Sequence, residues 1–359
     1  MRKQNRICLL CLSVLLAVMC FTGCQSEATD TRSKFSTDYF DYFDTVTTIV
    51  GYENSQEEFD EICAVIEQQL KEYHQLYHIY NRYENLNNMK TINDVKDGSH
   101  QTVEVDGRII DLLLYGKEIY ELTEGQTNIA MGSVLSIWHD YRTEGENDPA
   151  EAKLPSMEEL QTAAQHTDIN QMIIDQEAQT VYLADPVMKL DVGGLAKGYA
   201  VEQIALYLEE QGIDGYVLNV GGNVRTIGTR PEGEKWTVGI ENPGIPNSEE
   251  EFIAYLKLSG ESVVTSGAYQ RYYIVDGKPY HHVIDPDTLM PGEEFLSVSI
   301  ICNDSGLGDA LSTALFSMNF EEGKALIESI EDAEAMWTTP AGEIRYSSGF
   351  ESYMFEYEK

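Results

Sequence analysis

The stretch Asp191–Ala200, DVGGLAKGYA, places two adjacent glycines ahead of a lysine and a third glycine. It lacks the Ser or Thr of a P-loop, and its glycines do not have the G-x-G-x-x-G spacing of a dinucleotide fingerprint. The apolar residues before the glycines predict a strand, and Val201, Ile204 and Leu208 after them predict a helix. Such a helix start favours an anion, to which Lys197 adds positive charge. The alternative is a tight turn that needs glycine for its backbone geometry, followed by a solvated lysine.

The rest of the chain has the pattern of short strands joined by hairpins, with a few helices between them. Glycine-rich turns at 221–222, 276–277 and 341–342 predict three hairpins. Further strands are predicted at 179–183, 188–192, 216–220, 224–227 and 236–240, and helices at 59–77, 107–122 and 307–318 and after residue 321, with a loop over 144–155. Strands in hairpins with interspersed helices predict an α+β fold.

The N-terminus has the composition of a signal peptide. Basic residues precede an uncharged apolar run from Ile7 to Phe21, which is short for a membrane span. The run ends in small residues before Cys24, an arrangement that resembles the lipobox of bacterial lipoproteins. We therefore expect a signal peptide at 1–23 and a lipidated N-terminus and tether at 24–39; the alternative is ordinary secretion with an incidental cysteine.

Charge and cysteine content exclude two kinds of site. With 61 acidic residues against 24 basic ones, the chain has a formal net charge of −37, so phosphates of nucleic acids should be repelled and no nucleic acid partner is expected. Once the signal peptide and Cys24 are set aside, Cys63 and Cys302 remain. They either form one disulfide or are two buried thiols. Neither belongs to a CxxC pair, so a structural zinc site has no support.

Two further groups of residues can carry chemistry. Asp309 and Thr313 are four residues apart on a predicted helix and share a face, and their oxygen atoms suit Mg²⁺. The alternative is an Asp that favours the helix dipole and a Thr bonded to its own backbone. His281 and His282 lie in a predicted strand and should face opposite sides, so that one can serve as a general base while the other is structural.

Taken together, these stretches resemble the ApbE family, whose members are FAD:protein FMN transferases and often bacterial lipoproteins. The resemblance rests on ordered motifs: DVGGLAKGYA, NVGGNVRTIG at 219–228, VVTSGAYQRYY at 263–273, YHHVIDPDTLMP at 280–291 and DALSTALFSM at 309–318. The stretches HIYNRYENLN at 78–87 and TEGQTNIAMGSV at 123–134 extend it, so that it covers roughly Phe40 to Phe350. It implies one flavin transferase domain at 40–359, with a T-fold-like, two-lobed α+β body, mainly antiparallel sheets and FAD between the lobes.

The resemblance also implies roles for particular residues. The backbone carbonyl of Gly194 and the side chains of Asp309 and Thr313 would hold Mg²⁺, with Ser312 nearby, and His282 would be the catalytic base. The FAD contacts would fall on Phe43, Tyr80, Gln126, Thr127, Asn128, Asp191, Lys197 and the backbone of Ile284. Asn128 and Ala268 stand where many relatives carry Asp.

The implied reaction transfers FMN from FAD to a Thr or Ser hydroxyl of an acceptor flavoprotein through a phosphoester bond and releases AMP. The acceptors would be respiratory redox subunits or secreted flavoproteins, and the enzyme would be lipid-anchored on the outer side of the bacterial cell membrane. Two alternatives remain open. One is an FAD pyrophosphatase that gives FMN and AMP, and the other is a lipid-anchored FAD-binding protein without catalysis.

Overall fold

The computed structural model describes residues 30–95 and 102–356, and the predicted signal peptide and Cys24 lie outside these ranges. The first described strand, β1 (Ser33–Tyr42), begins inside the segment predicted as a tether. Phe35 and Tyr39 are half-buried against the core, whereas Lys34, Ser36 and Asp38 are exposed. This alternation is typical of a strand with one covered face, so the tether prediction for residues 33–39 is corrected.

An eight-stranded antiparallel sheet forms the centre of the molecule. Its order is β1, β2 (Thr45–Glu53), β6 (Tyr216–Val220), β7 (Asn223–Ile227), β10 (Ser262–Gly267), β13 (Ser297–Cys302), β14 (Glu334–Thr338) and β15 (Ile344–Tyr346). β2 pairs with β6 and β10 pairs with β13, although a long stretch of chain separates the two strands of each pair. The long connections after β2 and β10 therefore bring remote segments to the same sheet.

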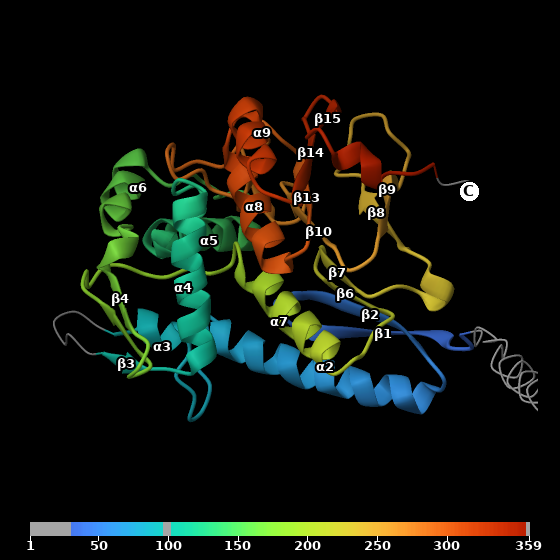
Figure 1. Ribbon diagram of the computed structural model, residues 1–359. Helices are drawn as coiled ribbons and strands as arrows, with labels where there is room; N and C mark the ends of the chain where they lie inside the picture. Colours follow the sequence, from blue (N-terminus) through green and yellow to red (C-terminus); the bar gives the residue numbers. More distant parts are fainter. Residues whose placement is uncertain (1–29, 96–101, 357–359) are drawn as a thin grey trace, which may run out of the picture.

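Helices α2 (Gln56–Tyr77), α7 (Ala196–Glu210) and α8 (Ser305–Ser317) pack on this sheet (Figure 1). Ser55 caps α2 by accepting a hydrogen bond from the Glu58 N–H. The apolar stripe of α2, which includes Phe59, Ile66 and Leu70, is buried in the largest core cluster. Burial of each such side chain stabilises the fold by about 1.5–3 kcal/mol, so packing rather than helix propensity holds α2 in place.

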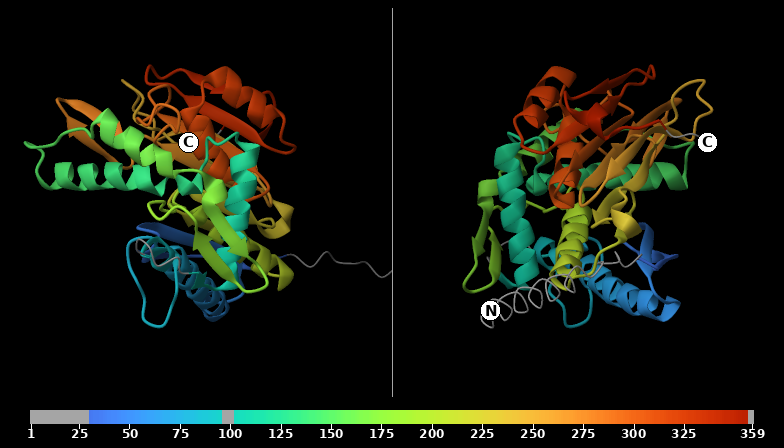
Figure 2. Two further views of the ribbon diagram at one scale, coloured as in Figure 1. Left: turned by 90° about the vertical axis from the view of Figure 1, so that its left-hand side faces the viewer. Right: turned by 45° about the vertical axis from the view of Figure 1, so that its right-hand side comes forward.

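Strand β13 is buried on both faces. Val298 and Ile300 pack in the core under α8, whereas Ile301 faces a second core made with β8 (Trp236–Glu241) and β9 (Phe252–Leu258). The β8–β9 hairpin thus covers the face of the sheet opposite the helices. Figures 1 and 2 place this hairpin at one end of the molecule and α4 (Gly107–Leu122) at the other.

The remaining elements surround this framework. They are the small sheet β3 (Val103–Glu104), β5 (Thr180–Leu183) and β4 (Met172–Asp175), the hairpin β11 (Tyr272–Val275) and β12 (Lys278–His281), the helices α3 (Met89–Asn93), α5 (Gly132–Asn147), α6 (Met157–Ala163) and α9 (Phe320–Glu328), and short 3₁₀ turns at 129–131, 164–166, 169–171, 231–233 and 350–353. A core cluster joins α5 and α6 to the β11–β12 hairpin. Over the described residues, every helix is too short or too polar to cross a membrane.

The α+β fold and the mainly antiparallel sheets are confirmed, and two local predictions are wrong. Residues 188–192 are not a strand, although they are largely buried. The predicted loop at 144–155 begins only after α5 ends at Asn147. Cys63 and Cys302 are free and buried, so the two-thiol alternative holds and the disulfide does not form.

Candidate active site

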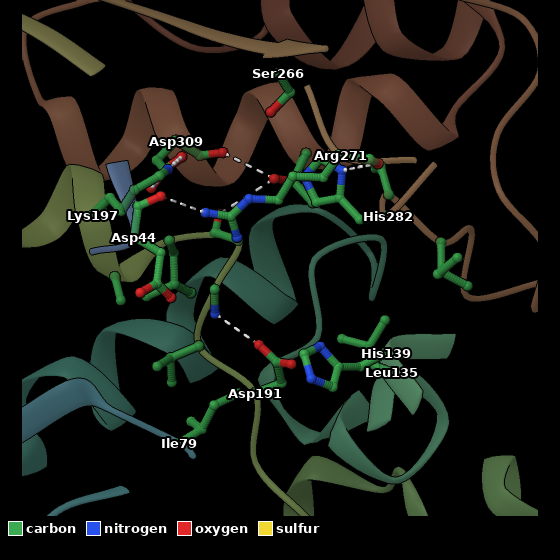
Figure 3. Close-up of a pocket in the computed structure, with 18 of the residues that line it drawn as sticks. Asp44, Ile79, Leu135, His139, Asp191, Lys197, Ser266, Arg271, His282 and Asp309 are labelled. Carbon is green, nitrogen blue, oxygen red and sulfur yellow. Dashed lines mark hydrogen bonds and ion pairs between the residues drawn. The ribbon is translucent and has the colours of Figure 1, made fainter. Parts of the chain in front are cut away.

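One pocket of about 560 Å³ brings together chain segments from the whole length of the protein (Figure 3). It is lined by the β1–β2 turn, the end of α2, the start of α7, the loop after β10, the end of β12 and one face of α8. Every residue that the sequence predicted for the site lies in its wall: Phe43, Tyr80, Gln126, Thr127, Asn128, Asp191, Gly194, Lys197, His282, Ile284, Asp309 and Thr313. The structure thus places these residues together, while their individual roles remain predictions.

The glycines before α7 serve close packing and not a special backbone conformation. Neither Gly193 nor Gly194 has a positive φ, so the tight-turn alternative does not explain them. A Cβ on Gly194 would lie 3.3 Å from Thr313 Oγ1, because α8 passes directly beside this turn. Asp191 Oδ1 accepts the Gly193 N–H at 2.9 Å and fixes the approach to the helix. Burial raises the pKa of Asp191.

The three predicted metal ligands lie together at the base of the pocket. Thr313 Oγ1 is 3.3 Å from the carbonyl oxygen of Gly194 and 3.2 Å from that of Asp309. Asp309 is buried, and its carboxylate accepts the Gly198 N–H at 2.8 Å and Lys197 Nζ at 3.3 Å. A carboxylate, a carbonyl and a hydroxyl form an oxygen donor set that fits Mg²⁺. Across the described residues no group of three His, Cys, Asp or Glu side chains could hold a metal, so phosphate or water oxygens would have to complete the coordination.

Ser312 does not join this oxygen set. Its hydroxyl lies 2.9 Å from the Asp309 carbonyl oxygen and 2.7 Å from Ser266 Oγ, and it is fully buried. It therefore ties α8 to β10 and supports the helix that carries Asp309 and Thr313.

The two adjacent histidines have different environments. His281 is the last residue of β12 and is buried, with Nε2 2.6 Å from the Gly292 carbonyl and Nδ1 accepting the Val283 N–H. Burial lowers the pKa of His281. Both of its ring nitrogens have backbone partners, which is typical of a structural histidine.

His282 follows the strand, in a bend, and lines the pocket. Its Nδ1 lies 3.3 Å from the Arg271 carbonyl oxygen, so Nδ1 carries the hydrogen and Nε2 is left with a free lone pair. Burial, followed by the cations of Arg271 and Arg142, lowers the pKa of His282 from 6.5 to about 3. A neutral imidazole with an unpaired Nε2 is the form that accepts a proton.

Aromatic side chains also line the pocket. The ring of Tyr80 stacks on His139 with centroids 4.6 Å apart, and its hydroxyl is 3.2 Å from His139 Nδ1. Phe43 and Asp44 form the β1–β2 turn with φ of 55° and 53°, a conformation that is uncommon for side chains of this size. The Phe43 N–H donates to His74 Nδ1 at 3.0 Å, which holds the turn against the end of α2.

The segment at 126–128 is fixed by hydrogen bonds to three other parts of the chain. Gln126 Nε2 donates to Asp287, and Thr127 Oγ1 donates to the Ala310 carbonyl at 2.8 Å. Asn128 accepts the Ala130 N–H and donates from Nδ2 to the Thr167 carbonyl. A carboxylate has no hydrogen to donate to that carbonyl, so the structure gives a physical reason for Asn at this position.

Ile284 lines the pocket, whereas Ala268 does not. Ile284 is buried in its wall and pairs with Pro291 in an isolated bridge. Ala268 donates its N–H to the Leu296 carbonyl at 2.9 Å and packs against the core under α8. Nothing in the structure explains the absence of a carboxylate at position 268.

Sequence reasoning missed several charged and aromatic residues of the pocket. Arg271, Arg142, His139, His74 and Asp44 all line it. Arg271 belongs to the VVTSGAYQRYY stretch, and its position shortly before the paired histidines was a usable signal. The other four have no spacing that distinguishes them from surface residues.

The fold and the site define a class: an α+β protein whose main pocket combines oxygen ligands, cations, a neutral imidazole and aromatic rings. The family follows from comparison, since the ApbE family model matches residues 43–337 and the chain belongs to that family. The FAD:protein FMN transferase of Klebsiella pneumoniae (strain 342) is 32% identical over 251 residues, which are 68% of this chain and 73% of that protein. The FAD:protein FMN transferase of Treponema pallidum is 30% identical over 261 residues, 69% of this chain and 70% of that protein.

A solved structure gives the same fold. The crystal structure of the ApbE protein from Thermotoga maritima superposes with a TM-score of 0.75 at 29% sequence identity. The match covers 90% of this chain and 100% of that one. The likeness therefore extends over the main sheet, its helices and the pocket segments between them.

Proposed function

We propose that this protein is an FAD:protein FMN transferase that attaches FMN to a Thr or Ser hydroxyl of an acceptor flavoprotein and releases AMP. The proposal rests on one observation: a neutral histidine and a set of oxygen donors line the same pocket. His282 presents a free Nε2, and Gly194, Asp309 and Thr313 present an oxygen donor set. The names of the curated relatives support the same reaction.

In the proposed reaction, His282 Nε2 takes the proton from the acceptor hydroxyl. The hydroxyl oxygen then forms a bond to the FMN-side phosphorus of FAD, and the bond from that phosphorus to the bridging oxygen breaks. AMP leaves with that oxygen. The Arg271 carbonyl fixes the His282 tautomer, because it accepts from Nδ1 and leaves Nε2 for the substrate.

Gly194, Asp309 and Thr313 would hold Mg²⁺ against the pyrophosphate. The bound ion supplies positive charge that offsets the negative charge on the phosphate oxygens. Lys197 adds a second positive charge at the same place, since its Nζ lies 3.3 Å from Asp309. The N-terminus of α7 lies beside it, and the helix dipole places partial positive charge there, which favours anions.

Phe43, Tyr80, Gln126, Thr127, Asn128, Asp191 and Ile284 would bind the rest of FAD. The aromatic rings of Phe43 and Tyr80 offer faces for stacking, and Asp191 offers a hydrogen-bond acceptor. The β1–β2 turn and the Tyr80–His139 stack set the shape of this part of the pocket.

We also propose that the enzyme acts outside the cytoplasm as a lipoprotein. The support is in the sequence: the signal peptide pattern at 1–23 and the small residues before Cys24. Two acyl chains on Cys24 would give stable membrane attachment. The acceptors would then be extracytoplasmic, such as respiratory redox subunits or secreted flavoproteins.

The test follows FMN and AMP together. The mature protein is incubated with FAD, Mg²⁺ and an acceptor that carries a Thr or Ser, and acceptor mass and free AMP are measured. His282→Asn is the matched variant, because its amide can still donate to the Arg271 carbonyl but has no base. We expect its transfer rate to fall by roughly 10²–10⁴-fold while FAD binding persists.

His281→Ala serves as the second control and should lower stability more than chemistry, since His281 bonds only to backbone. If the wild type forms one acceptor-linked FMN for each AMP released, the result supports the transferase function. AMP release without an acceptor would instead identify a pyrophosphatase, and FAD binding without AMP would identify a carrier. Full transfer by His282→Asn would remove the base from the mechanism.

A further inference from the structure

Arg271 spans the pocket through both its backbone and its side chain. Its carbonyl oxygen accepts from His282 Nδ1 at 3.3 Å, and its Nη2 donates to the Asp44 carbonyl at 3.2 Å. Figure 3 shows the side chain running from the side of His282 toward Asp44, with Lys197 and Asp309 beyond it. One residue thus contacts both His282 and the β1–β2 turn.

The guanidinium of Arg271 has no carboxylate partner within the described part of the chain. All the other arginines described there form an ion pair: Arg32, Arg82, Arg108, Arg142, Arg225, Arg230 and Arg345. In a protein with 61 acidic residues, an arginine that remains unpaired at the wall of a pocket is available to an anionic ligand. The Asp44 carbonyl uses one of its five N–H donors.

The position of this guanidinium matches the place where the reacting phosphate must lie. The phosphorus has to lie close enough to form a bond with the oxygen of the hydroxyl that His282 deprotonates. Its pyrophosphate oxygens also have to reach the oxygen set at Asp309 and Thr313. Arg271, His282, Asp309 and Thr313 line the same pocket, and Figure 3 shows the Arg271 side chain extending from the side of His282 toward Asp44, on the side of the pocket where Lys197 and Asp309 lie. A guanidinium binds phosphate oxygens in a bidentate manner.

We propose that Arg271 is a further catalytic residue, which clamps the phosphoryl group under attack through its guanidinium and positions His282 through its carbonyl. This inference rests on the proposed function. As the acceptor oxygen bonds to phosphorus and the bond to AMP breaks, negative charge grows on the phosphoryl oxygens. Donors already in place stabilise that charge without reorganisation.

The same cation affects the base. The charged groups that act on His282 are Arg271 from the loop after β10, Arg142 from α5 and His281 from β12, and all three lower its pKa. Arg271 has the largest effect after burial. Removal of its charge should therefore raise the pKa of His282, a change that a purely structural residue would not cause.

The experiment compares Arg271→Gln, Arg271→Lys and the control Arg230→Gln in the full mature chain. Arg230 pairs with Glu234 and lies outside the pocket, so this control removes one positive charge elsewhere. Three quantities are measured for each: the Kd of FAD by flavin fluorescence, the pH profile of kcat/KM for AMP release with acceptor, and the thermal midpoint.

We expect Arg271→Gln to weaken FAD binding about tenfold or more, as loss of a charge-assisted hydrogen bond does. Its kcat should fall roughly 10²–10³-fold, the loss typical of one preorganised donor. The acid limb of its kcat/KM profile should move to higher pH. Arg271→Lys keeps the charge and should keep the acid limb near its wild-type position, with only partial recovery of kcat.

The inference is overturned if Arg271→Gln keeps the wild-type kcat and acid limb while the protein is folded. If Arg271→Gln has a lowered thermal midpoint, Arg271→Lys decides the question instead. The inference then requires that Arg271→Lys keeps the acid limb of the wild type and has a reduced kcat. If the wild type itself releases no AMP and labels no acceptor, the proposed function fails. The clamp is then judged by FAD affinity alone, and an unchanged Kd in Arg271→Gln refutes it.

Discussion

The backbone N–H of Gly198 donates to Asp309 Oδ2 at 2.8 Å, and this bond joins helix α7 to helix α8 at the floor of the pocket. A Cβ on Gly198 would lie 2.2 Å from the Ser305 carbonyl oxygen and 2.5 Å from Asp309 Cβ. The two helix backbones approach so closely only because residue 198 has no side chain. Lys197 next to it can then reach the same carboxylate.

Gly198→Ala should separate α7 from α8. The added methyl group meets backbone that cannot rotate away, so we expect the free energy of unfolding to fall by about 1–3 kcal/mol. FMN transfer should fall as well, because Asp309 moves from Lys197 and Gly194. Denaturant unfolding and AMP release measure the two effects. Glu210→Ala, at the exposed end of α7, should change neither, and wild-type values for Gly198→Ala would refute the close-packing account.

Asp309→Asn should separate the charge of this side chain from its packing. The amide still accepts the Gly198 N–H, but it has no negative charge for a metal or for Lys197. The apparent Mg²⁺ affinity should fall by at least the roughly 10- to 100-fold that loss of an outer metal partner costs. In the wild type, Mn²⁺ should replace Mg²⁺, because it also prefers oxygen ligands.

The control for this variant is Asp304→Asn on the same helix. Asp304 caps α8 by accepting two N–H groups, and Asn caps helices equally well. Its Mg²⁺ titration should match the wild type. Asp309→Asn with an unchanged Mg²⁺ titration would mean that Asp309 only supports the helix start.

The pH profile of transfer should have its acid limb well below the ordinary histidine value. His282 accepts a proton only when neutral, and its pKa is lowered from 6.5 to about 3. Hence kcat/KM, which reports the free enzyme, should stay flat as the pH falls from 7 through 5. A midpoint at or above 6.5 would show that His282 is not the base or is not in this environment.

The lowered pKa of His282 should also make the stability of the folded protein depend on pH. Below pH 6.5 the unfolded chain binds a proton at residue 282, whereas the folded protein does not until much lower pH. The folded state therefore loses stability as the pH falls. Circular dichroism at each pH is needed to confirm that rates are measured on folded enzyme.

His74→Phe should loosen the β1–β2 turn. His74 Nδ1 accepts the Phe43 N–H at 3.0 Å, and its Nε2 lies 3.2 Å from the Tyr83 hydroxyl. Loss of one net hydrogen bond of about 1 kcal/mol corresponds to ~5-fold weaker FAD binding, with a smaller change in kcat. Tyr83→Phe keeps the Phe43 bond and should bind FAD as the wild type does. Equal affinities in all three proteins would show that the turn does not depend on His74.

Cys24→Ser tests the anchor. If Cys24 is the lipidated residue, the variant should remain unprocessed or be released from the membrane, because the two acyl chains are lost. Fractionation and mass spectrometry of the N-terminus measure this. Normal processing and membrane retention of Cys24→Ser would refute the lipoprotein assignment.

The sequence predicted elements well where apolar spacing and turn chemistry agree. Helix α4 was predicted with its observed ends, and the Gly221–Gly222 turn has the positive φ that its glycines allow. The run at 188–192 was wrongly predicted as a strand. Its periodicity indicates which side chains are buried, but it does not indicate whether the backbone forms hydrogen bonds with a neighbouring strand. There the Leu190 N–H donates to the Asn93 side chain and the Asp191 N–H to the Ile129 carbonyl.

The site was predictable where a motif carries several residues at fixed spacing, as Asp309 and Thr313 do. Arg271 and His139 are single residues whose importance arises only from three-dimensional neighbours. Gly198 is a similar case. No side chain fits at this position because the backbone of Ser305, 107 positions later in the sequence, lies against it.

The spread of the pocket along the chain has a consequence for biosynthesis. Its wall begins at Phe43 and is complete only with Thr313 in α8. A growing chain therefore lacks the complete pocket until α8 has left the ribosome and docked on α7. A ligand of this pocket can stabilise only the finished protein and not the chain during its synthesis.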